Sequence, residues 1–457
     1  MKIVFLIFSL AIFLFSKDIK LEDGSIYDGE LRYGKPFGYG KLVYPNKTTY
    51  EGNFNKGKYD GDGVLVFSDQ SSYKGSFKDG LYEGKGVLEI KNGYIYTGEF
   101  IKGKKTGIAK IKFADARVYE GEFEEDNING MGTMTFADGS KYIGYFKNGK
   151  MNGSGTLYLA SKAKYTGEFK DGDFHGKGRM EYANDDVYEG EFKNGLKHGI
   201  GVLKYSYGDV YDGRFKNDKF NGMAVFRHVV GDVYEGEFKE GKKDGSGKVK
   251  FADGSIYEGF FKNDFFHDNG VMIYSNDNRY DGGFFDGKRE GFGKFAFADG
   301  STYEGEFKNG LYHGKGKISY ANGDIYDGGF EAGQKSNKGV YLAKRGDRYD
   351  GEFKSDEFGL KGIYALFNGD VYEGDFNMSK KNGKGIYTFN SKEKYEGEYK
   401  NGNRDGYGVY ITENGSVYEG FFANNKKNGE GKYIDIDGTV FEGIFVEDKY
   451  KYKKRFF

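Results

Sequence analysis

The sequence predicts an all-β fold, an elongated single-layer array of antiparallel β-hairpins with a 23-residue repeat. The first observation behind this prediction is an aromatic residue that recurs every 23 residues, at nineteen positions from Tyr27 to Phe441. Glycine follows two residues after each of them, from Gly29 to Gly443, and an apolar residue stands two further on. A fixed period of this length is typical of units that bury their apolar surface by stacking on neighbouring units.

The second observation is an alternation of apolar and polar residues at the start of each repeat. Tyr188, Gly190 and Phe192 share one parity, and Glu189 and Glu191 stand between them. Such a period of two is typical of a strand with one packed and one solvated face. The sequence then predicts a turn of six residues, 193–198, and a second alternating strand over 199–205.

The third observation concerns turns. Asp-Gly or Asn-Gly pairs close many repeats, and glycine or asparagine supplies the positive φ angles that tight hairpin turns require. Glycines also recur inside the predicted strands, where they normally weaken a sheet. We therefore expect an aromatic ring from a neighbouring strand to lie on the backbone of residues such as Gly29 and Gly201. The Asp-Gly and Asn-Gly pairs at the predicted turns are Asp138-Gly139, Asp253-Gly254, Asp299-Gly300, Asn322-Gly323, Asn368-Gly369 and Asn414-Gly415.

The repeated unit resembles the MORN repeat, named for membrane occupation and recognition nexus. The resemblance rests on the segments 188–201 and 303–316, and it extends over residues 17–446 as about 18 full repeats with partial ends. It implies an antiparallel β array that serves as a scaffold and interaction module, often near membranes and sometimes as a dimer. The residues that hold the repeat positions in these two segments are Tyr188, Gly190, Phe192, Gly199, Gly201, Tyr303, Gly305, Phe307, Gly314 and Gly316.

Some repeats depart from this pattern. Asp268, Asn337 and Leu360 replace the first glycine after the hairpin turn, and Phe441 replaces the last head tyrosine. Ala109 and Ala224 replace the second glycine. We expect these departures to change the curvature of the array locally and to leave its fold intact.

The composition excludes several classes of function. The formal net charge is −1, so the bulk attraction to nucleic acid or an anionic membrane is missing. The chain has no cysteine, which excludes disulfides, thiolate metal sites and a cysteine nucleophile. It also has no tryptophan, the aromatic residue on which sugar and choline cages typically depend. Cell-wall carbohydrate binding is therefore the weakest alternative.

The N-terminus differs from the repeats. One lysine, an apolar run over residues 3–15 and the small residue Ser16 are typical of a secretory signal peptide cleaved after residue 16. The run is short for a membrane span, which needs about 20 apolar residues. We expect a secreted or envelope protein. An uncleaved anchor through residues 3–15, or a buried first strand, is the alternative.

The sequence offers no site for catalysis, a cofactor or a metal ion. Four of the five histidines share one repeat position, which indicates a contact with a hairpin turn; a metal bridging two chains is the alternative. Carboxylates such as Glu304 and Glu306 recur in equivalent surroundings, whereas acid–base catalysis needs two different environments. We expect them to pair with lysines such as Lys177 and Lys315. The four histidines are His175, His198, His267 and His313, and the fifth is His228.

The chain ends in a basic and aromatic tail, residues 447–457. This tail favours a terminal strand that protects a sheet edge with lysine, or a contact with a membrane or partner. The predicted function is an exported, non-enzymatic scaffold that binds a protein partner or itself, with a peripheral lipid-binding module as the alternative. The tail residues expected to contact a membrane or a partner are Lys451, Lys453, Lys454, Arg455, Phe456 and Phe457.

Overall fold

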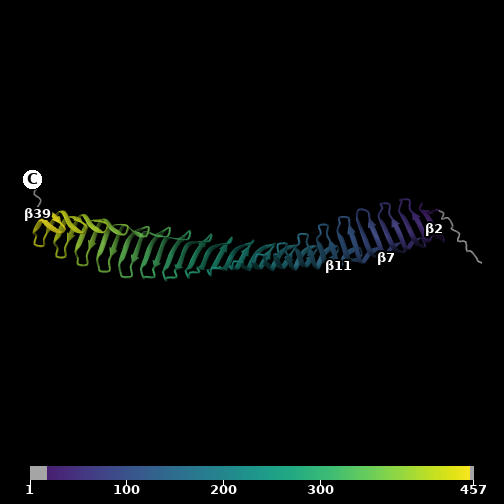
Figure 1. The fold of residues 1–457 in the computed structure, drawn as a ribbon, viewed down its shortest axis with the longest axis horizontal. Coiled ribbons are helices and arrows are strands. Elements are labelled where there is room, and N and C mark those ends of the chain that lie inside the picture. The colour runs from purple at the N-terminus through teal and green to yellow at the C-terminus, as the bar shows by residue number, and fades with distance from the viewer. Residues whose placement is uncertain (1–17, 453–457) are drawn as a thin grey trace, which may run out of the picture. The chain divides into compact units, whose positions relative to one another are not determined.

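The computed structural model describes residues 18–452, and these residues form 39 β-strands and no helix. The chain divides into two compact units, up to Phe220 and from Asn221 onward, and we describe each by itself. In each unit, strands that follow one another in sequence pair antiparallel, so that hairpin follows hairpin along a single layer (Figure 1). The predicted all-β hairpin array is confirmed.

The strands of the first unit are β1 (Ile19–Lys20), β2 (Ile26–Arg32), β3 (Lys35–Val43), β4 (Thr49–Asn55), β5 (Lys58–Val66), β6 (Ser72–Lys78), β7 (Leu81–Ile90), β8 (Tyr94–Ile101), β9 (Lys104–Phe113), β10 (Val118–Glu124), β11 (Asn127–Thr135), β12 (Lys141–Lys147), β13 (Lys150–Tyr158), β14 (Lys164–Lys170), β15 (Asp173–Glu181), β16 (Val187–Lys193), β17 (Leu196–Lys204) and β18 (Val210–Lys216).

The chain continues through β19 (Lys219–Arg227), and the strands of the second unit are β20 (Val233–Lys239), β21 (Lys242–Lys250), β22 (Ile256–Lys262), β23 (Phe265–Ile273), β24 (Arg279–Phe285), β25 (Lys288–Ala296), β26 (Thr302–Lys308), β27 (Leu311–Ser319), β28 (Ile325–Glu331), β29 (Gln334–Leu342), β30 (Arg348–Lys354), β31 (Glu357–Ala365), β32 (Val371–Asn377), β33 (Lys380–Thr388), β34 (Lys394–Lys400), β35 (Asn403–Ile411), β36 (Val417–Ala423), β37 (Lys426–Ile434), β38 (Val440–Val446) and β39 (Lys449–Tyr452).

Each hairpin joins a short strand to a long strand through a two-residue turn. Between β16 and β17 this turn is Asn194-Gly195, and both residues have positive φ angles, 51° and 81°. Two successive positive φ angles are typical of a type I′ turn, whose twist matches that of the paired strands. The predicted six-residue turn over 193–198 is therefore wrong, because the chain already reverses within two residues.

A bulge lies further along the long strand. Gly199 has a φ of 61°, and the register of β16 against β17 shifts between Gly190 and Glu191. This bulge explains why the sequence of the segment looks like that of a loop. At the equivalent position Asp268 and Asn337 also have positive φ angles, which these two residue types tolerate. Leu360 is the exception: it is 71% exposed, and the pairing of β31 with β32 begins at the residue after it.

The turn between successive hairpins has the predicted positive φ. Gly139 has a φ of 89°, and its N–H donates to the carbonyl of Phe136 at 3.0 Å. The Asp138 carboxylate accepts a hydrogen bond from the Ser140 N–H at 2.9 Å. The Ser140 hydroxyl in turn accepts from the N–H of Ala160, one repeat later, at 3.0 Å. These contacts tie each turn to the next.

The core of each hairpin is one tyrosine ring that lies over a pair of glycines. Gly190 of β16 faces Gly201 of β17, and the ring of Tyr188 covers both. The ring reaches Gly201 from the neighbouring strand, as we expected, but Gly190 is covered by a ring of its own strand. The expectation of a ring from a neighbouring strand is therefore wrong for Gly29, the equivalent of Gly190, which Tyr27 of its own strand covers.

The eighteen head tyrosines from Tyr27 to Tyr418 are each at most 1% exposed. Each donates its hydroxyl hydrogen to the carbonyl oxygen three residues later, as Tyr188 does to Glu191 at 2.9 Å. That carbonyl lies at the register shift, so the tyrosine satisfies a backbone group near the bulge.

Phenylalanines connect successive tyrosines. The ring of Phe192 stands edge-on to Tyr188 of its own repeat, at 5.0 Å, and to Tyr165 of the preceding repeat, at 5.1 Å. Edge-to-face pairs at such distances are favourable because the positive ring edge meets the negative ring face. The same contacts recur in the second unit, where Phe330 stands between Tyr303 and Tyr326.

The glycine pair yields a first prediction. A Cβ on Gly190 would lie 2.5 Å from Gly201 Cα and 2.7 Å from the Ile200 carbonyl oxygen, which are backbone atoms. A Cβ on Gly201 would meet atoms of the Tyr188 ring, which can shift. We expect Gly190→Ala to destabilise by about 1–3 kcal/mol, the usual scale of overpacking, and Gly201→Ala by less.

Thermal melts of the full chain followed by circular dichroism test this order, with Glu189→Ala on the solvated face as the control. The buried residues Ala109 and Ala224 already stand at the position of Gly201, whereas every repeat has glycine at the position of Gly190. Equal damage from the two alanines would contradict the proposed role of the backbone contact.

The buried tyrosines yield a second prediction. Burial raises the pKa of Tyr142 and Tyr395 to about 12, above the ordinary value of 10.0. The unfolded chain therefore ionises first, so the stability these groups contribute is complete below pH about 10 and is lost as the pH rises toward the folded pKa. We expect tyrosinate absorbance from the buried rings to appear together with loss of the β-sheet dichroism signal. Full ionisation of all tyrosines with an unchanged dichroism spectrum would contradict this.

Candidate interaction surface

The face opposite the tyrosine rings carries two rows of side chains and is called the outer face. Row one contains the residues one and fourteen positions after each head tyrosine, such as Glu189 and Val202. Row two contains the residues three and twelve positions after it, such as Glu191 and Ile200. The paired glycines lie between the two rows, and a Cβ on them would point to the tyrosine rings of the other face, so the surface between the rows is formed by backbone.

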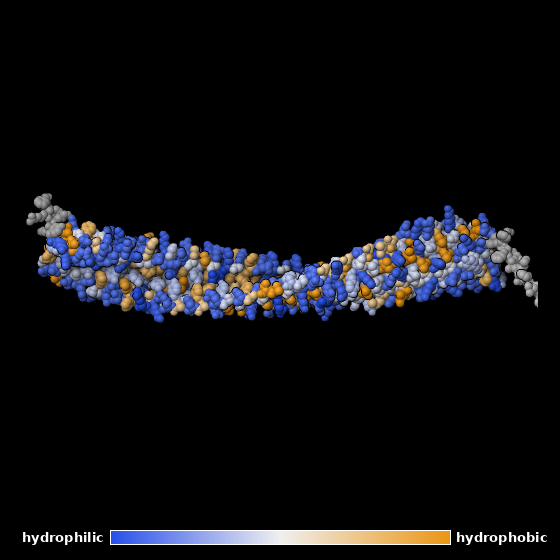
Figure 2. Space-filling view, in the orientation of Figure 1, coloured by the Kyte–Doolittle hydropathy of each residue, from blue (hydrophilic) through white to orange (hydrophobic). Residues whose placement is uncertain are grey.

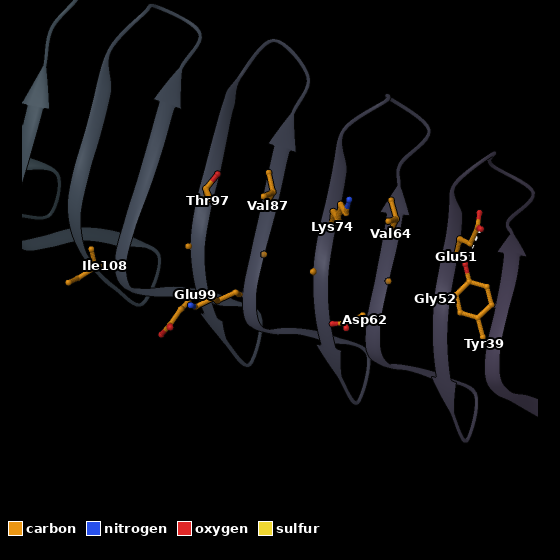
Figure 3. Close-up of a pocket in the computed structure, with 15 residues that line it drawn as sticks. Tyr39, Glu51, Gly52, Asp62, Val64, Lys74, Val87, Thr97, Glu99 and Ile108 are labelled. Atoms are coloured by element: carbon orange, nitrogen blue, oxygen red, sulfur yellow. Dashed lines mark hydrogen bonds between the residues drawn. The ribbon is translucent and has the colours of Figure 1, made fainter.

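In the first unit this arrangement forms a groove of about 930 Å³ across β3–β9. Five of the paired glycines form its floor. Figure 3 shows the two rows of side chains on either side. Row one contributes Glu51, Val64, Lys74, Val87 and Thr97, and row two contributes Tyr39, Asp62, Lys85, Glu99 and Ile108. The floor glycines are Gly52, Gly63, Gly75, Gly86 and Gly98.

Two large apolar side chains in row two are exposed at the ends of this groove. Tyr39 is 65% and Ile108 is 80% exposed. The Tyr39 hydroxyl donates to Glu51 Oε1 at 3.1 Å (dashed in Figure 3), and Lys41 Nζ lies 3.6 Å from Glu51 Oε2. The groove therefore offers apolar contacts, fixed charges of both signs and an accessible backbone, which is the mixture found in protein-binding surfaces.

A second groove, of about 690 Å³, lies on the outer face of the second unit. It has the same glycine floor, here Gly351, Gly362 and Gly374, but its walls carry more charge. The space-filling view shows hydrophobic residues in small groups among hydrophilic ones (Figure 2). The outer face thus repeats one architecture with locally different side chains. The polar and apolar wall residues are Lys338, Asp350, Glu352, Lys361, Ile363, Glu373, Asp375, Lys384 and Ile386.

Several row-two carboxylates accept hydrogen bonds from backbone N–H groups next to the bulge. Glu191 accepts a hydrogen bond from the N–H of Ile200 at 3.3 Å, and the backbone N–H groups of Lys177 and Lys315 donate in the same way to Glu168 and Glu306. These two lysines thus meet a carboxylate through their backbone, whereas we expected ammonium pairs. Pairing across the strands does occur in row one, where Arg179 Nη1 lies 3.4 Å from Glu189 Oε2. The hydrogen bond and charge of Lys110 lower the pKa of Glu120.

The histidines occupy the bulge region of the long strands. His175 faces Glu168 and His198 faces Glu191 across their hairpins. The Nδ1 atom of His198 is buried without a hydrogen bond, and that of His267 lies 3.2 Å from Asp268 Oδ1. Between residues 18 and 452 no three potential ligands from His, Cys, Asp and Glu lie close enough to hold a metal ion. The metal that could bridge two chains stays a prediction.

The repeat positions chosen from the sequence lie in the packed layer, where Tyr188, Phe192, Tyr303 and Phe307 are buried. They build the sheet and leave the outer face free for contacts. The sequence reasoning missed the groove, because its walls come from residues of several strands that only the register brings together. Of the C-terminal tail, Lys449–Tyr452 form β39 and Lys451 is exposed. Residues 453–457, with Lys453, Lys454, Arg455, Phe456 and Phe457, and the leader 1–16 lie outside the described residues.

The sequence model of the MORN repeat matches seventeen segments that together cover most of residues 27–440. The chain belongs to the MORN repeat family. MORN repeats indicate a repeat protein that takes part in protein or membrane interactions, and members of this family are typically non-enzymatic. The unmatched interval 349–371 contains Leu360, the residue that departs from the bulge. The matched segments are 27–49, 50–72, 73–93, 96–115, 119–141, 142–163, 165–187, 188–210, 211–233, 234–256, 257–279, 280–302, 303–325, 326–348, 372–393, 395–417 and 418–440.

Solved structures of other proteins show a weak likeness. The TCP10 domain of Danio rerio CPAP in complex with a peptide of STIL is 9% identical, with a TM-score of 0.26, over 49% of this chain and 96% of that one. The TCP domain of Drosophila melanogaster SAS-4, in complex with a proline-rich motif of Ana2, is 13% identical, with a TM-score of 0.18, over 39% and 85%. These scores are too low to bear on function. No curated protein matches the chain in sequence.

Residues 18–452 contain no helix with the length and apolar character that crossing a membrane requires.

Proposed function

We propose that this MORN-repeat protein is an exported, non-enzymatic scaffold that binds a protein partner along its outer face. The observation that carries the proposal is the glycine-floored groove of the first unit, with exposed Tyr39 and Ile108 at its ends. An extended peptide segment suits such a groove, because backbone atoms are accessible between two rows of side chains.

The charges of the groove favour a protein over an anionic lipid surface. Its walls carry Glu51, Asp62 and Glu99 against Lys74 and Lys85, so the charges nearly cancel. Binding to anionic lipid depends on clusters of several basic residues, each contributing about 1 kcal/mol near the surface. Mixed charges around apolar side chains instead resemble the rim and core of a protein interface. We therefore place the partner in the class of proteins.

The proposal of a non-enzymatic role rests on the repetition. Within the described residues, carboxylates such as Glu168, Glu191 and Glu306 make the same bond to a bulge N–H in repeat after repeat. Catalysis needs groups whose surroundings differ. Hydrogen bonds do lower the pKa of Asp324 and Asp370, and the donors are turn residues and a tyrosine of the adjacent repeat, which connect neighbouring turns.

The groove yields a third prediction. Ile108→Asp should reduce binding of the partner at least about tenfold, because losing an apolar contact and placing a charge in an interface together cost more than 1.4 kcal/mol. Ile200→Asp is the matched control, since Ile200 occupies the same repeat position outside the groove and is 56% exposed. Tagged full-length protein, isolated with its partner under crosslinking, is quantified for wild type and both variants.

Equal capture by the wild type and Ile108→Asp would exclude the groove. Flotation of the protein with vesicles that contain anionic phosphatidylserine tests the alternative, in which the protein binds lipid. Flotation that persists in both variants, without a captured protein, would replace the scaffold proposal with peripheral lipid binding.

The leader yields a fourth prediction. If residues 1–16 direct export, the protein recovered outside the cytoplasm should begin near Lys17 when its N-terminus is sequenced. Recovery of intact Met1 in a membrane fraction would support the anchor through residues 3–15 instead.

A further inference from the structure

In most repeats the residue nine positions after the head tyrosine lies on the tyrosine ring, and we call the residue at this position the covering residue. Tyr59 stacks on Tyr50 with ring centres 3.7 Å apart, and Lys243 places its ammonium 4.9 Å from the ring centre of Tyr234. Almost every covering residue among residues 18–452 is aromatic or basic. The three that are neither are Pro36, Ile128 and Met151.

The covering residue can also contact the residue that begins the preceding turn. The Tyr59 hydroxyl lies 2.6 Å from the Tyr44 hydroxyl, and Lys197 Nζ donates to the Tyr182 hydroxyl at 3.2 Å. These bonds join the covering residue to the turn beside it. Met151 has neither a hydroxyl nor an ammonium group, so it forms no such bond with its preceding turn.

A cavity of about 450 Å³ lies at Met151, in the first unit. Its apolar wall consists of Met151, Leu157 and Leu159 of one repeat and Phe136, which begins the preceding turn. The ring contacts that Tyr142, the head of this repeat, makes among residues 18–452 are both edge-on, so no ring is stacked on its face. The cavity therefore lies beside the position that a ring or a cation fills in other repeats.

The rim of this cavity carries an excess of negative charge. Arg117 Nε lies 2.8 Å from Asp115 Oδ2, so these two charges offset each other. The Asp138 carboxylate accepts hydrogen bonds from the N–H and the hydroxyl of Ser140, at 2.9 Å and 3.0 Å. In the described part of the chain this exposed carboxylate forms no ion pair. A basic group in an occupant of the cavity would supply one.

We propose that this cavity binds an aromatic side chain of a partner protein, with a basic residue next to it that pairs with Asp138. The fold accommodates a ring at this position, because Phe174 occupies it in the next repeat and stacks on Tyr165 at 4.0 Å. Met151 suits an incoming ring, since its flexible side chain adapts in shape and its sulfur makes favourable contacts with aromatic rings.

The surroundings of the cavity suit a side chain of another protein. The rim residues Ala137 and Asp138 are exposed, so the cavity opens onto the protein surface. Its walls belong to the tyrosine side of the sheet, whereas the glycine-floored groove lies on the outer face. The proposal is therefore independent of that groove and of the partner proposed for it.

A peptide with one tryptophan tests this site, because the chain contains no tryptophan and the indole fluorescence is read selectively. The probe is acetyl-Lys-Trp-Lys-amide, and acetyl-Glu-Trp-Glu-amide is the charge control. We expect a saturable change in indole emission when full-length protein is added to the lysine peptide, and weaker binding of the glutamate peptide.

Met151→Phe should fill the cavity with the ring that Phe174 provides in the next repeat. We expect it to weaken binding of the lysine peptide at least about tenfold, the scale on which losing an aromatic anchor weakens an interface. Met151→Lys, which introduces the residue type of Lys197, is a second filling variant and should give the same loss. Circular dichroism verifies that each variant keeps its β-sheet.

Asp138→Asn tests the charge separately from the ring. Asparagine holds this turn position in other repeats, such as Asn184 and Asn322, so the turn is retained. The variant should bind the lysine peptide less tightly by a factor of at most about five, the scale of an exposed ion pair. It should also no longer distinguish the two peptides.

The contrary outcomes are equally specific. Absence of saturable binding to the wild type, or unchanged binding to the folded filling variants, would overturn the proposal. Equal binding of both peptides by the wild type would overturn the role of Asp138. Binding that is lost in Ile108→Asp but retained in Met151→Phe would assign the peptide to the outer-face groove instead.

Discussion

The structure depends on one tyrosine per repeat that fills the space of two missing side chains. The ring of Tyr188 lies over Gly190 and Gly201, and its hydroxyl hydrogen bonds the Glu191 carbonyl beside the register shift. A single-layer sheet has no second layer to cover its apolar face. The ring therefore provides the cover from within the hairpin, and it lies on a pair of glycines in most repeats.

This interaction explains why the two glycines of a pair differ in tolerance. A Cβ at Gly190 would meet backbone atoms of the paired strand as well as the Tyr188 hydroxyl, whereas the nearest atoms to one at Gly201 all belong to the tyrosine ring and its hydroxyl. Ala109 and Ala224 occur only at the second position, and the tyrosines Tyr96 and Tyr211 above them remain fully buried. Backbone contacts are thus the stricter constraint, since moving a strand disturbs its whole ladder of hydrogen bonds.

The sequence was sufficient for the features that recur in every repeat. The 23-residue period, the alternation around Tyr188 and the Asp-Gly turns gave the strands and the antiparallel hairpins. It misplaced the hairpin turn, because Gly199 resembles a loop residue although its positive φ belongs to a bulge. The groove was not predicted, because it depends on how side chains of several strands line up across the sheet. Its walls become visible only when the register places Tyr39 and Ile108 along one face.

The residue that covers each tyrosine ring also varies from repeat to repeat. Nine residues after each head, an aromatic and a basic residue alternate through ten successive repeats, from Phe174 to Lys381. Phe174 stacks on Tyr165 at 4.0 Å, whereas Lys197 places its ammonium 5.8 Å from the ring centre of Tyr188. The full series is Phe174, Lys197, Phe220, Lys243, Phe266, Arg289, Tyr312, Lys335, Phe358 and Lys381.

Three lysines of this series, Lys197, Lys243 and Lys335, meet an aspartate in the turn of the following hairpin. Lys197 and Lys243 each donate their backbone N–H to an aspartate there, Asp218 and Asp264, at 2.9 Å and 2.8 Å. Where the covering residue is aromatic, that turn position is a glycine in four repeats, such as Gly195 after Phe174, and is Ser379 after Phe358. The turn position is also a glycine after Arg289 and Lys381, so the alternation of the covering residue recurs through all ten repeats but its aspartate partner does not. The core is completed in both kinds of hairpin, which leaves the outer face free to differ from repeat to repeat and to carry the proposed contacts with a partner.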